Sequence, residues 1–406
     1  MPDLDDLIAY LDASPSPFHA ADSAAQRLLA AGFEPLRLSE PWPHVPAAGF
    51  VVRGAALIAW RRPTAATAAA PVRIVGAHTD SPCLRIKPRP DTGLLGWRQL
   101  GIEVYGGVLL NSWLDRDLGI AGRVVLDDGA TADVCIDAPI CRVAQLAIHL
   151  DRDVNERGLV LDKQAHLTPI WGTGVAQPGE FSRWLTEQID AGDAAAASWE
   201  LSLYDRTPAA ILGADGSLLA SGRIDNQVSC WAAVDALVDA HPASTAGAAG
   251  PLLEQVLERL AIAGGLGRDD HLAQLAGSSC VSADCAHAVH PNYVERHEPD
   301  HRPLVNHGPA IKVNSNQRYA TTSATAAMLQ RVFDDAGVPW QRFVSRNNMP
   351  CGSTIGPITA TRLGVETVDV GIPQLSMHSA RELCGATDPV WLSTGLRAYF
   401  ESSARS

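Results

Sequence analysis

The sequence lacks the features that mark secreted, membrane and nucleic-acid-binding proteins. Its 8 cysteines are scattered without a C-x-x-C pair, which favours reduced thiols over a disulfide framework. No apolar run is long enough to span a bilayer, and the acidic first residues lack the basic stretch of a secretory signal. The net charge is −13, with no cluster of Lys or Arg, so we expect neither nucleic acid nor an anionic membrane as a partner. Together these absences predict a cytoplasmic protein.

The chain is long, and two kinds of sequence pattern alternate along it. At 406 residues it exceeds one ordinary core, which predicts two domains. Helical periodicity and short apolar strands fill residues 1–88 and 216–406, whereas 89–215 carry short β-type runs and turn signals. We therefore predict an α/β fold in which a discontinuous mixed-sheet domain, 1–88 plus 216–406, carries an inserted, mainly β domain at 89–215. The elements expected after the insertion are helices near 226–240, 251–262, 322–336 and 388–401, and strands at 279–283, 308–314, 341–345 and 366–370.

One stretch interrupts the alternation of strands and helices. The helix predicted at 226–240 is followed by 241–250, which is rich in alanine and glycine, and then directly by the helix predicted at 251–262. In an alternating chain a strand is expected between two such helices. The sequence predicts no strand there.

The mostly apolar run 72–76 is soon followed by His78 and Asp80. Such a run is typical of a strand buried on both faces, and α/β sheets bind their ligands at the carboxyl ends of their strands. His78 is therefore a candidate metal ligand, and Asp80 is a candidate for orienting it. An isolated His-x-Asp pair is also common in turns that have no chemistry.

Three further residues of ligand type stand at the ends of predicted elements: Asp225, Asp284 and His378. Taken singly, Asp225 would be a helix N-cap, Asp284 a turn residue and His378 a surface histidine. Taken with His78, they form a set of imidazoles and carboxylates without a thiolate, which suits zinc, manganese or cobalt. A carboxylate that bridges two ions would suit the two-metal sites of aminopeptidases.

Seven short motifs, taken together and in this order, resemble the aspartyl aminopeptidase family of co-catalytic zinc exopeptidases. They are residues 76–82, 146–150, 223–226, 282–287, 311–319, 351–357 and 377–382. A related metal-dependent deacylase or a glutamyl-type aminopeptidase would match 311–319 and 351–357 less closely.

The resemblance implies a role for each residue of the metal site. His78, Asp225 and Asp284 would hold one zinc, and Asp225 would bridge to a second zinc that is also held by His378. Asp80 would be the catalytic-site residue that orients the metal centre.

The resemblance also implies a substrate and an assembly. Lys312, His287 and Tyr319 would line the substrate pocket, and His149 of the inserted domain would reach the site of a neighbouring subunit. The enzyme would remove N-terminal Asp or Glu from peptides by attack of a metal-activated water. The inserted domain would serve dimerisation and cap the substrate, and dimers would pack into a dodecamer.

The sequence departs from the family pattern at one place. The family has a strand ending in Asp-x-Glu-Glu between the helices predicted here at 226–240 and 251–262, and it supplies a general base and a ligand of the second zinc. Residues 241–253 contain no acid, and Glu254 and Glu258 fall within an amphipathic helix. We therefore predict a weak or inactive enzyme with one or two metals, or a chain that has lost this segment. The alternative is a catalytically inactive homologue that acts as an oligomeric scaffold or a single-metal binding protein.

Overall fold

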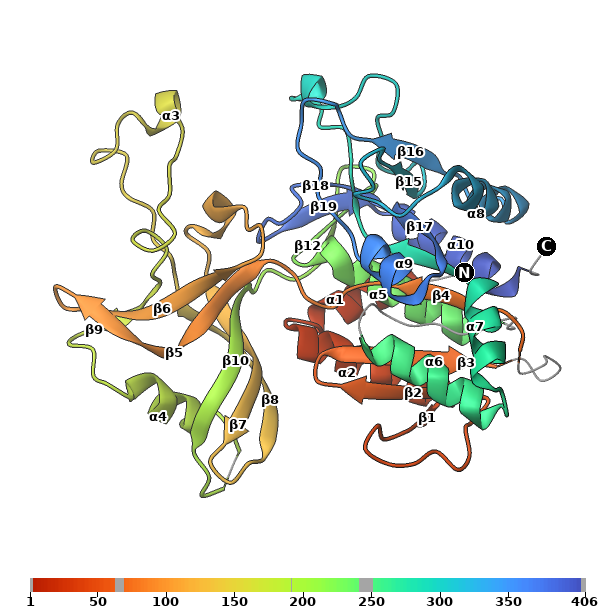
Figure 1. Cartoon of the computed structure of the whole chain (residues 1–406). Coiled ribbons are helices and arrows are strands. Elements are labelled where there is room, and N and C mark those ends of the chain that lie inside the picture. Colours follow the sequence, from red (N-terminus) through yellow and green to blue (C-terminus); the bar gives the residue numbers. More distant parts are fainter. Residues whose placement is uncertain (1–2, 63–68, 191, 241–250, 403–406) are drawn as a thin grey trace.

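The computed structural model describes residues 3–62, 69–190, 192–240 and 251–402. It consists of a larger unit of sheets and helices and a second unit that projects from it, on the left in Figure 1. The predicted α/β fold with a mixed sheet is confirmed. The sequence predicts no strand between the helices at 226–240 and 251–262. The segment concerned, 241–250, lies outside the described residues.

The main sheet of the larger unit has five strands in the order β16-β15-β17-β13-β4. β13 runs parallel to both β4 and β17, whereas β15 runs antiparallel to β17. All five residues of β13 are buried, as expected for a central strand covered on both faces. The bounds are β4 Arg73–Gly76, β13 Ser279–Ala283, β15 Ala310–Val313, β16 Gln341–Val344 and β17 Glu366–Gly371.

Two smaller sheets flank the main sheet. One has three strands, β1 (Glu34–Pro35), β2 (Ala48–Arg53) and β3 (Ala56–Arg61), of which β2 and β3 form an antiparallel hairpin. The other has the order β11-β12-β19-β18-β14. Its bounds are β11 Ala210–Leu212, β12 Leu218–Ser221, β14 Ala286–His287, β18 Pro373–Leu375 and β19 Glu382–Gly385.

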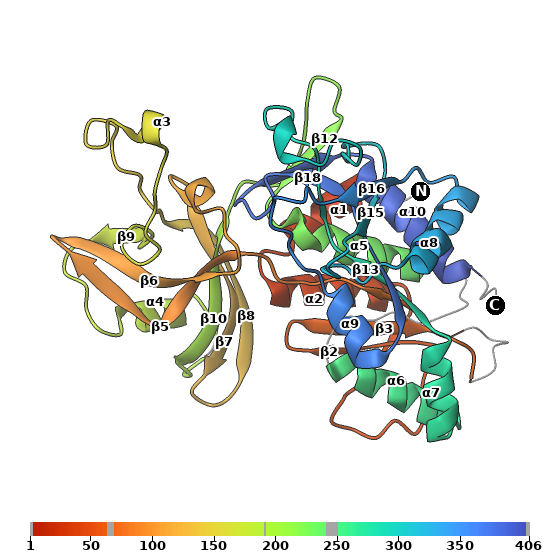
Figure 2. The same ribbon diagram turned by 45° about the horizontal axis from the view of Figure 1, so that its top comes forward.

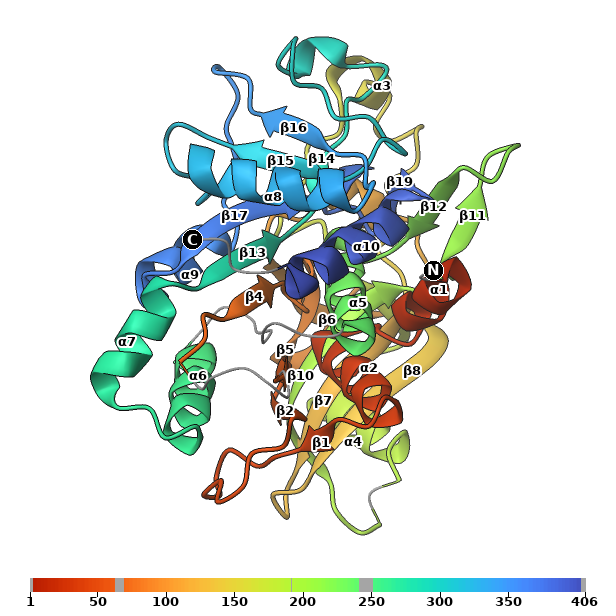
Figure 3. The same ribbon diagram turned by 90° about the vertical axis from the view of Figure 1, so that its right-hand side faces the viewer.

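Helix α5 (Ile224–Asp239) is the centre of the larger core. Trp231 and most of its neighbours on α5 are buried, because α1, α2 and α10 pack around the helix. Figure 3 shows α5 between α10 and α2. The other helices of this unit are α1 Leu4–Asp12, α2 Pro17–Ala30, α6 Pro251–Ala263, α7 Arg268–Ala276, α8 Ser323–Asp335, α9 Gly356–Leu363 and α10 Asp388–Glu401. The four helices predicted after the insertion correspond to α5, α6, α8 and α10.

The second unit is a six-stranded antiparallel sheet with its own core (Figure 2). Its elements are β5 Cys83–Leu94, β6 Trp97–Tyr105, β7 Leu118–Leu126, β8 Thr131–Cys141, α3 Val154–Arg157, β9 Ile170–Thr173, α4 Glu180–Glu187 and β10 Ala196–Asp205. The expected boundary at residue 88 therefore falls inside β5, and the β11–β12 hairpin pairs with the larger unit. We propose 83–205 as the inserted domain.

All eight cysteines are free thiols. Among the described residues, no helix has the length and apolar character needed to cross a membrane.

Candidate metal centre

Four predicted ligands lie at neighbouring element ends of the larger unit. His78 follows β4 and Asp284 follows β13, and these parallel strands are adjacent, so their carboxyl ends share one edge of the sheet. Asp225 lies near the start of α5, and His378 lies in the turn between β18 and β19. The backbone of Asp225 is non-helical and forms a kink in the first turn of α5.

The structure brings these four side chains together. Nε2 of His78 lies 3.5 Å from Oδ1 of Asp225 and 3.9 Å from Oδ1 of Asp284, and Nε2 of His378 lies 3.1 Å from Oδ2 of Asp225. One ligand atom from each of His78, Asp225 and Asp284 lies within 4.8 Å of the others, a spacing that one metal ion could bridge.

One oxygen of this cluster has no hydrogen-bond partner. Oδ1 of Asp225 is buried and receives no hydrogen bond within the described part of the chain. Buried carboxylate oxygens are normally satisfied, and a coordinated cation satisfies them as well as a donor does. The donor set of imidazoles and carboxylates therefore fits a zinc ion held by His78, Asp225 and Asp284.

The charges of the centre depend on one another. Burial opposes a proton on His78, but the carboxylates of Asp225, Asp284 and Asp80 raise its pKa well above the ordinary value. Burial likewise opposes ionisation of Asp225, but the imidazoles of His378 and His78 hold its pKa below the usual range. A metal ion that binds here must displace the proton of His78.

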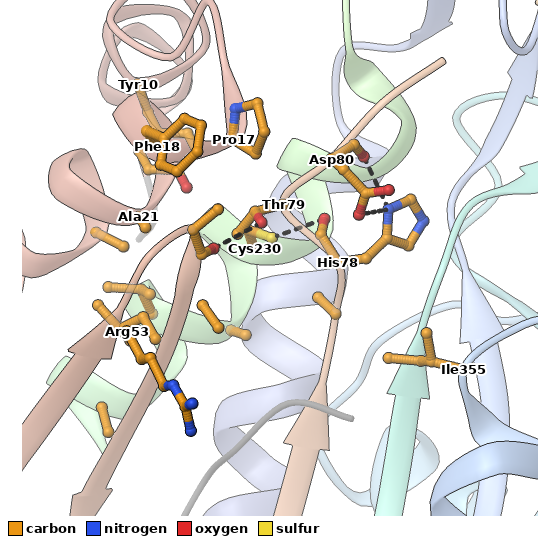
Figure 4. Close-up of a pocket in the computed structure, with 18 of the residues that line it drawn as sticks. Tyr10, Pro17, Phe18, Ala21, Arg53, His78, Thr79, Asp80, Cys230 and Ile355 are labelled. Atoms are coloured by element: carbon orange, nitrogen blue, oxygen red, sulfur yellow. Dashed lines mark hydrogen bonds and ion pairs between the residues drawn. The ribbon is translucent and has the colours of Figure 1, made fainter. Parts of the chain in front are cut away.

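Asp80 fixes the orientation of His78. Nδ1 of His78 lies 2.9 Å from the backbone oxygen of Asp80 and 3.6 Å from its carboxylate, which leaves Nε2 facing the other ligands. Figure 4 shows the ring and this carboxylate side by side. The hydroxyl of Tyr105, on β6 of the inserted sheet, donates to Oδ2 of Asp80 at 2.5 Å.

A second buried carboxylate, that of Glu382 on β19, links the backbone of Asp225 to the backbone of His378. It accepts the backbone N–H of Asp225 at 2.9 Å and of His378 at 2.6 Å. Burial raises the pKa of Glu382 to about 8. The inserted unit holds the same turn, because Nδ1 of His378 lies 3.0 Å from the oxygen of Gly107, and Leu109 N–H donates to the His378 oxygen.

The predicted substrate residues differ in burial: Lys312 is buried beside a candidate ligand, whereas His287 and His149 are exposed. Lys312, on β15, is buried, with Nζ 3.8 Å from Oδ1 of Asp284 and 5.3 Å from the ring centre of Tyr319. His287 follows three residues after Asp284 and is exposed. His149 lies in an exposed loop of the inserted unit, and the structure does not bring it to the four ligands.

The backbone around Asp284 requires a glycine at residue 371. A Cβ added to Gly371, at the end of β17, would lie 1.7 Å from the backbone oxygen of Asp284. We expect Gly371→Ala to destabilise the fold by about 1–3 kcal/mol or more, as overpacking does, and to weaken metal binding. Urea unfolding and zinc titration measure both effects. Gly352→Ala is the control, because a Cβ there meets nothing within 4 Å. Equal behaviour of the two variants would contradict the prediction.

Comparisons with known proteins identify the family. The profile described as "Aminopeptidase I zinc metalloprotease (M18)" matches residues 10–246 and 241–400. The chain belongs to the M18 family. It is 48% identical over 419 aligned positions to a "Probable M18 family aminopeptidase 2" of Streptomyces coelicolor, covering 98% of this chain and 97% of that one. A protein of Mycobacterium tuberculosis with the same description is 45% identical, with 98% and 97% covered.

Solved structures agree with this assignment. The chain in "Cryo-EM structure of the Ape4 and Nbr1 complex" is 32% identical and superposes with a TM-score of 0.91, covering 98% of this M18 chain and 85% of that one. An M18 aminopeptidase from Thermotoga maritima, at 22% identity and a TM-score of 0.86, shares the fold, with 98% and 96% covered. The resemblance noted in the sequence is thus confirmed at the level of the M18 zinc metallopeptidases.

Sequence reasoning missed two residues that support the site. Tyr105 falls in a short β-type run, but nothing in the sequence indicates that its hydroxyl meets Asp80. Glu382 belongs to the motif 377–382, in which an acidic residue near a histidine was the available signal. Its burial and its backbone partners depend on the pairing of β12 with β19.

Proposed function

We propose that this M18 chain is a zinc-dependent aminopeptidase whose metal centre consists of His78, Asp225, Asp284 and His378. The observation that supports it most directly is the buried carboxylate of Asp225, which lies between two imidazoles and whose Oδ1 receives no hydrogen bond within the described part of the chain. Zinc bound there would polarise the scissile carbonyl and ease deprotonation of the attacking water. The chain itself would orient His78 through Asp80 and hold the spacing of Asp225 and His378 through Glu382.

We also propose that the enzyme prefers N-terminal Asp or Glu. Lys312 is a buried ammonium beside the ligand Asp284, and a charge-assisted bond to a substrate carboxylate would be strong in such surroundings. His287 and Tyr319 would form the rest of this pocket.

Lys312→Met tests the acidic preference. We expect kcat/KM for a Glu-aminoacyl substrate to fall by about 10–100-fold, the loss of a charge-assisted hydrogen bond worth about 1.5–3 kcal/mol. The rate on an Ala-aminoacyl substrate should change much less, which makes that substrate the internal control. An equal fall for both substrates would assign Lys312 to the metal centre rather than to specificity.

The catalytic power of this chain is proposed to be low. The described ligands of the second metal position are Asp225 and His378, fewer than the three or four that zinc usually takes from proteins. The family profile matches in two sections that meet at 241–246, and the alignment with the Streptomyces protein is longer than this chain. Both facts support a missing segment there. The second candidate function is a non-catalytic homologue with one metal.

Metal content and turnover together test the proposal. The chain is dialysed against zinc or manganese, its metal content is measured per chain, and hydrolysis of Asp- and Glu-aminoacyl substrates is assayed. One tightly bound zinc with slow hydrolysis supports a weak enzyme, and one zinc without hydrolysis supports the second candidate. Fast hydrolysis with two zinc ions would overturn the proposed impairment, and no zinc at all would overturn the metal centre.

We propose self-association through the inserted unit, in dimers and a dodecamer. A yeast relative with the same fold is described as "Structure of S. cerevesiae mApe1 dodecamer". In this chain the loop around His149 exposes apolar side chains that a monomer would leave in water, among them Leu150 at 74% and Val160 at 84% exposure. Such contacts would place His149 at a neighbour's site. The free thiols agree with a reducing, cytoplasmic setting.

Leu150→Asp tests the assembly. We expect the variant to shift to smaller species in sedimentation velocity, because a buried charge at an interface is strongly unfavourable. Leu272→Asp is the matched control, since Leu272 is an exposed leucine on α7, outside the inserted unit. An unchanged distribution for Leu150→Asp would remove this loop from the interface.

A further inference from the structure

Asp369 is a buried acid of the main sheet that is not one of the four candidate metal ligands. It lies on β17, which runs between β13 and β15 (Figure 3), and it is 0% exposed. The residues before and after it, Val368 and Val370, belong to the core around α5. Since successive residues of a strand point to opposite faces of the sheet, the carboxylate of Asp369 points away from that core.

Each oxygen of this carboxylate accepts a hydrogen bond from a different loop. Oδ2 accepts the backbone N–H of Ala320 at 2.6 Å, in the loop between β15 and α8. Oδ1 accepts the hydroxyl of Thr354 at 2.5 Å, in the loop between β16 and α9. The backbone N–H of Asp369 also donates to the hydroxyl of Thr321 at 2.9 Å. One buried residue therefore fixes two loops that are distant in the sequence.

The start of α9 approaches this carboxylate closely because residue 356 is a glycine. A Cβ added to Gly356 would lie 2.5 Å from Oδ1 of Asp369, closer than real Cβ atoms come to such an oxygen. Burial raises the pKa of Asp369, while the hydroxyl of Thr354 and the charge of Lys312 oppose this rise. The surroundings of Asp369 therefore fit a short side chain that accepts hydrogen bonds through two oxygens.

The two loops that Asp369 holds form part of the wall beside Lys312. The ring centre of Tyr319, in the first loop, lies 5.3 Å from Nζ of Lys312. Cys351, in the second loop, packs against the small apolar cluster that contains Tyr319 and Phe343. Sγ of Cys351 donates to the hydroxyl of Tyr319 at 3.2 Å. The two loops thus contact each other at the pocket wall, and both are anchored to Asp369.

We infer that Asp369 is a positioning residue of the substrate pocket, which holds Tyr319 and Cys351 in place beside Lys312 and so sets how tightly an acidic substrate side chain binds. The part of this inference that concerns binding rests on the proposed function, since Lys312 is the group that would receive that side chain. A loop that moved away would admit water beside the buried ammonium. A charge-assisted hydrogen bond is weaker where the local dielectric is higher.

Substitution of Thr354 tests this role, because it removes one of the two links and leaves Lys312 and Tyr319 unchanged. Thr354→Val keeps the shape of the side chain and removes the hydroxyl, whereas Thr354→Ser keeps the hydroxyl. Thr361→Val is the control, because the hydroxyl of Thr361, on α9, donates to the backbone oxygen of Pro357 and not to Asp369.

The first readout is the affinity for acidic ligands. We expect Thr354→Val to lower kcat/KM for a Glu-aminoacyl substrate by about tenfold or more, chiefly through KM, since a displacement of about 1 Å can cost about 10²-fold. The rate on an Ala-aminoacyl substrate should change much less. Binding of free L-glutamate to the zinc-loaded chain, measured by calorimetry, should weaken in parallel and requires no turnover. Thr354→Ser and Thr361→Val should both behave like the unaltered chain.

The second readout reports the position of the loop and requires neither zinc nor turnover. The thiol of Cys351 is half-buried and bonded to Tyr319, so alkylation by iodoacetamide should become several-fold faster when the loop moves. Peptide mapping by mass spectrometry separates this thiol from the other seven. Thr354→Val should raise the rate, and Asp369→Asn should do the same, because an amide accepts hydrogen bonds through only one of its two terminal atoms.

The outcomes separate this inference from the proposed function. Unchanged alkylation and unchanged L-glutamate binding in Thr354→Val would overturn the inference, as would faster alkylation with unchanged L-glutamate binding. Equal losses on Glu- and Ala-aminoacyl substrates would also overturn it, because a role in general stability predicts that result. If the unaltered chain binds zinc but does not prefer Glu to Ala, the proposed acidic preference fails. Faster alkylation of Thr354→Val would then still establish that Asp369 holds the two loops.

Discussion

Asp225→Asn is expected to lower the zinc affinity of the chain by at least about 10²-fold. Substitution of a residue that only supports a metal ligand already lowers metal affinity by about 10–100-fold, and Asp225 is a proposed ligand itself. The amide keeps the shape of the carboxylate but loses the charge that faces both His78 and His378. The pKa of His78 should fall at the same time, since Asp225 is the first of the carboxylates that raise it.

Competition with a chromophoric chelator measures this affinity, and urea unfolding of the metal-free chain measures stability beside it. Asp235→Asn is the matched control on the same helix, where the carboxylate accepts from Ser393 at 2.5 Å, outside the metal centre. A structural role for Asp225 alone would change unfolding and leave zinc affinity intact. That result would refute the assignment of Asp225 as the shared ligand.

Replacing residues 241–250 with the segment that the Streptomyces coelicolor protein carries between the corresponding helices raises kcat by about 10²–10⁴-fold. This is the range that a positioned general base contributes. The resemblance noted in the sequence implies two glutamates in that segment, one as the base and one as a ligand of the second metal. We therefore expect the metal content to rise from one zinc to two per chain.

Stopped assays on Glu-aminoacyl substrates, together with metal analysis, check this result. The same replacement with both glutamates changed to glutamine is the control, because it restores chain length without the carboxylates. If the control gains as much activity as the full replacement, the effect belongs to the fold and not to the acids. If neither gains, the proposed cause of weak activity is wrong.

The candidate ligands could be proposed from the sequence because several of them stand at the ends of predicted strands. His78 and Asp284 each follow a short apolar run, and parallel neighbours bring such residues to one edge. The helices α5, α6, α8 and α10 were predictable from periodicity and length. These are local signals, so a single sequence contains them.

The rest depends on pairing between distant segments. Glu382 is buried and faces Asp225 only after β19 has joined β12. Tyr105 reaches Asp80 only because β6 lies beside β5. The limit of the inserted sheet at Cys83 rather than residue 88 likewise follows from the partners of β5. The periodicity of a short stretch of sequence does not show which distant strands will pair, or in which register.

The hydrogen bonds from Tyr105 to Asp80 and between Gly107 and His378 link the projecting sheet to both imidazoles of the centre. Either half expressed alone would lose these supports, so we do not expect a core fragment to hold zinc as the intact chain does. Rocking of the projecting sheet would tilt both rings together. Any force that a neighbouring subunit applied to that sheet would therefore be transmitted mechanically to the ion-holding atoms.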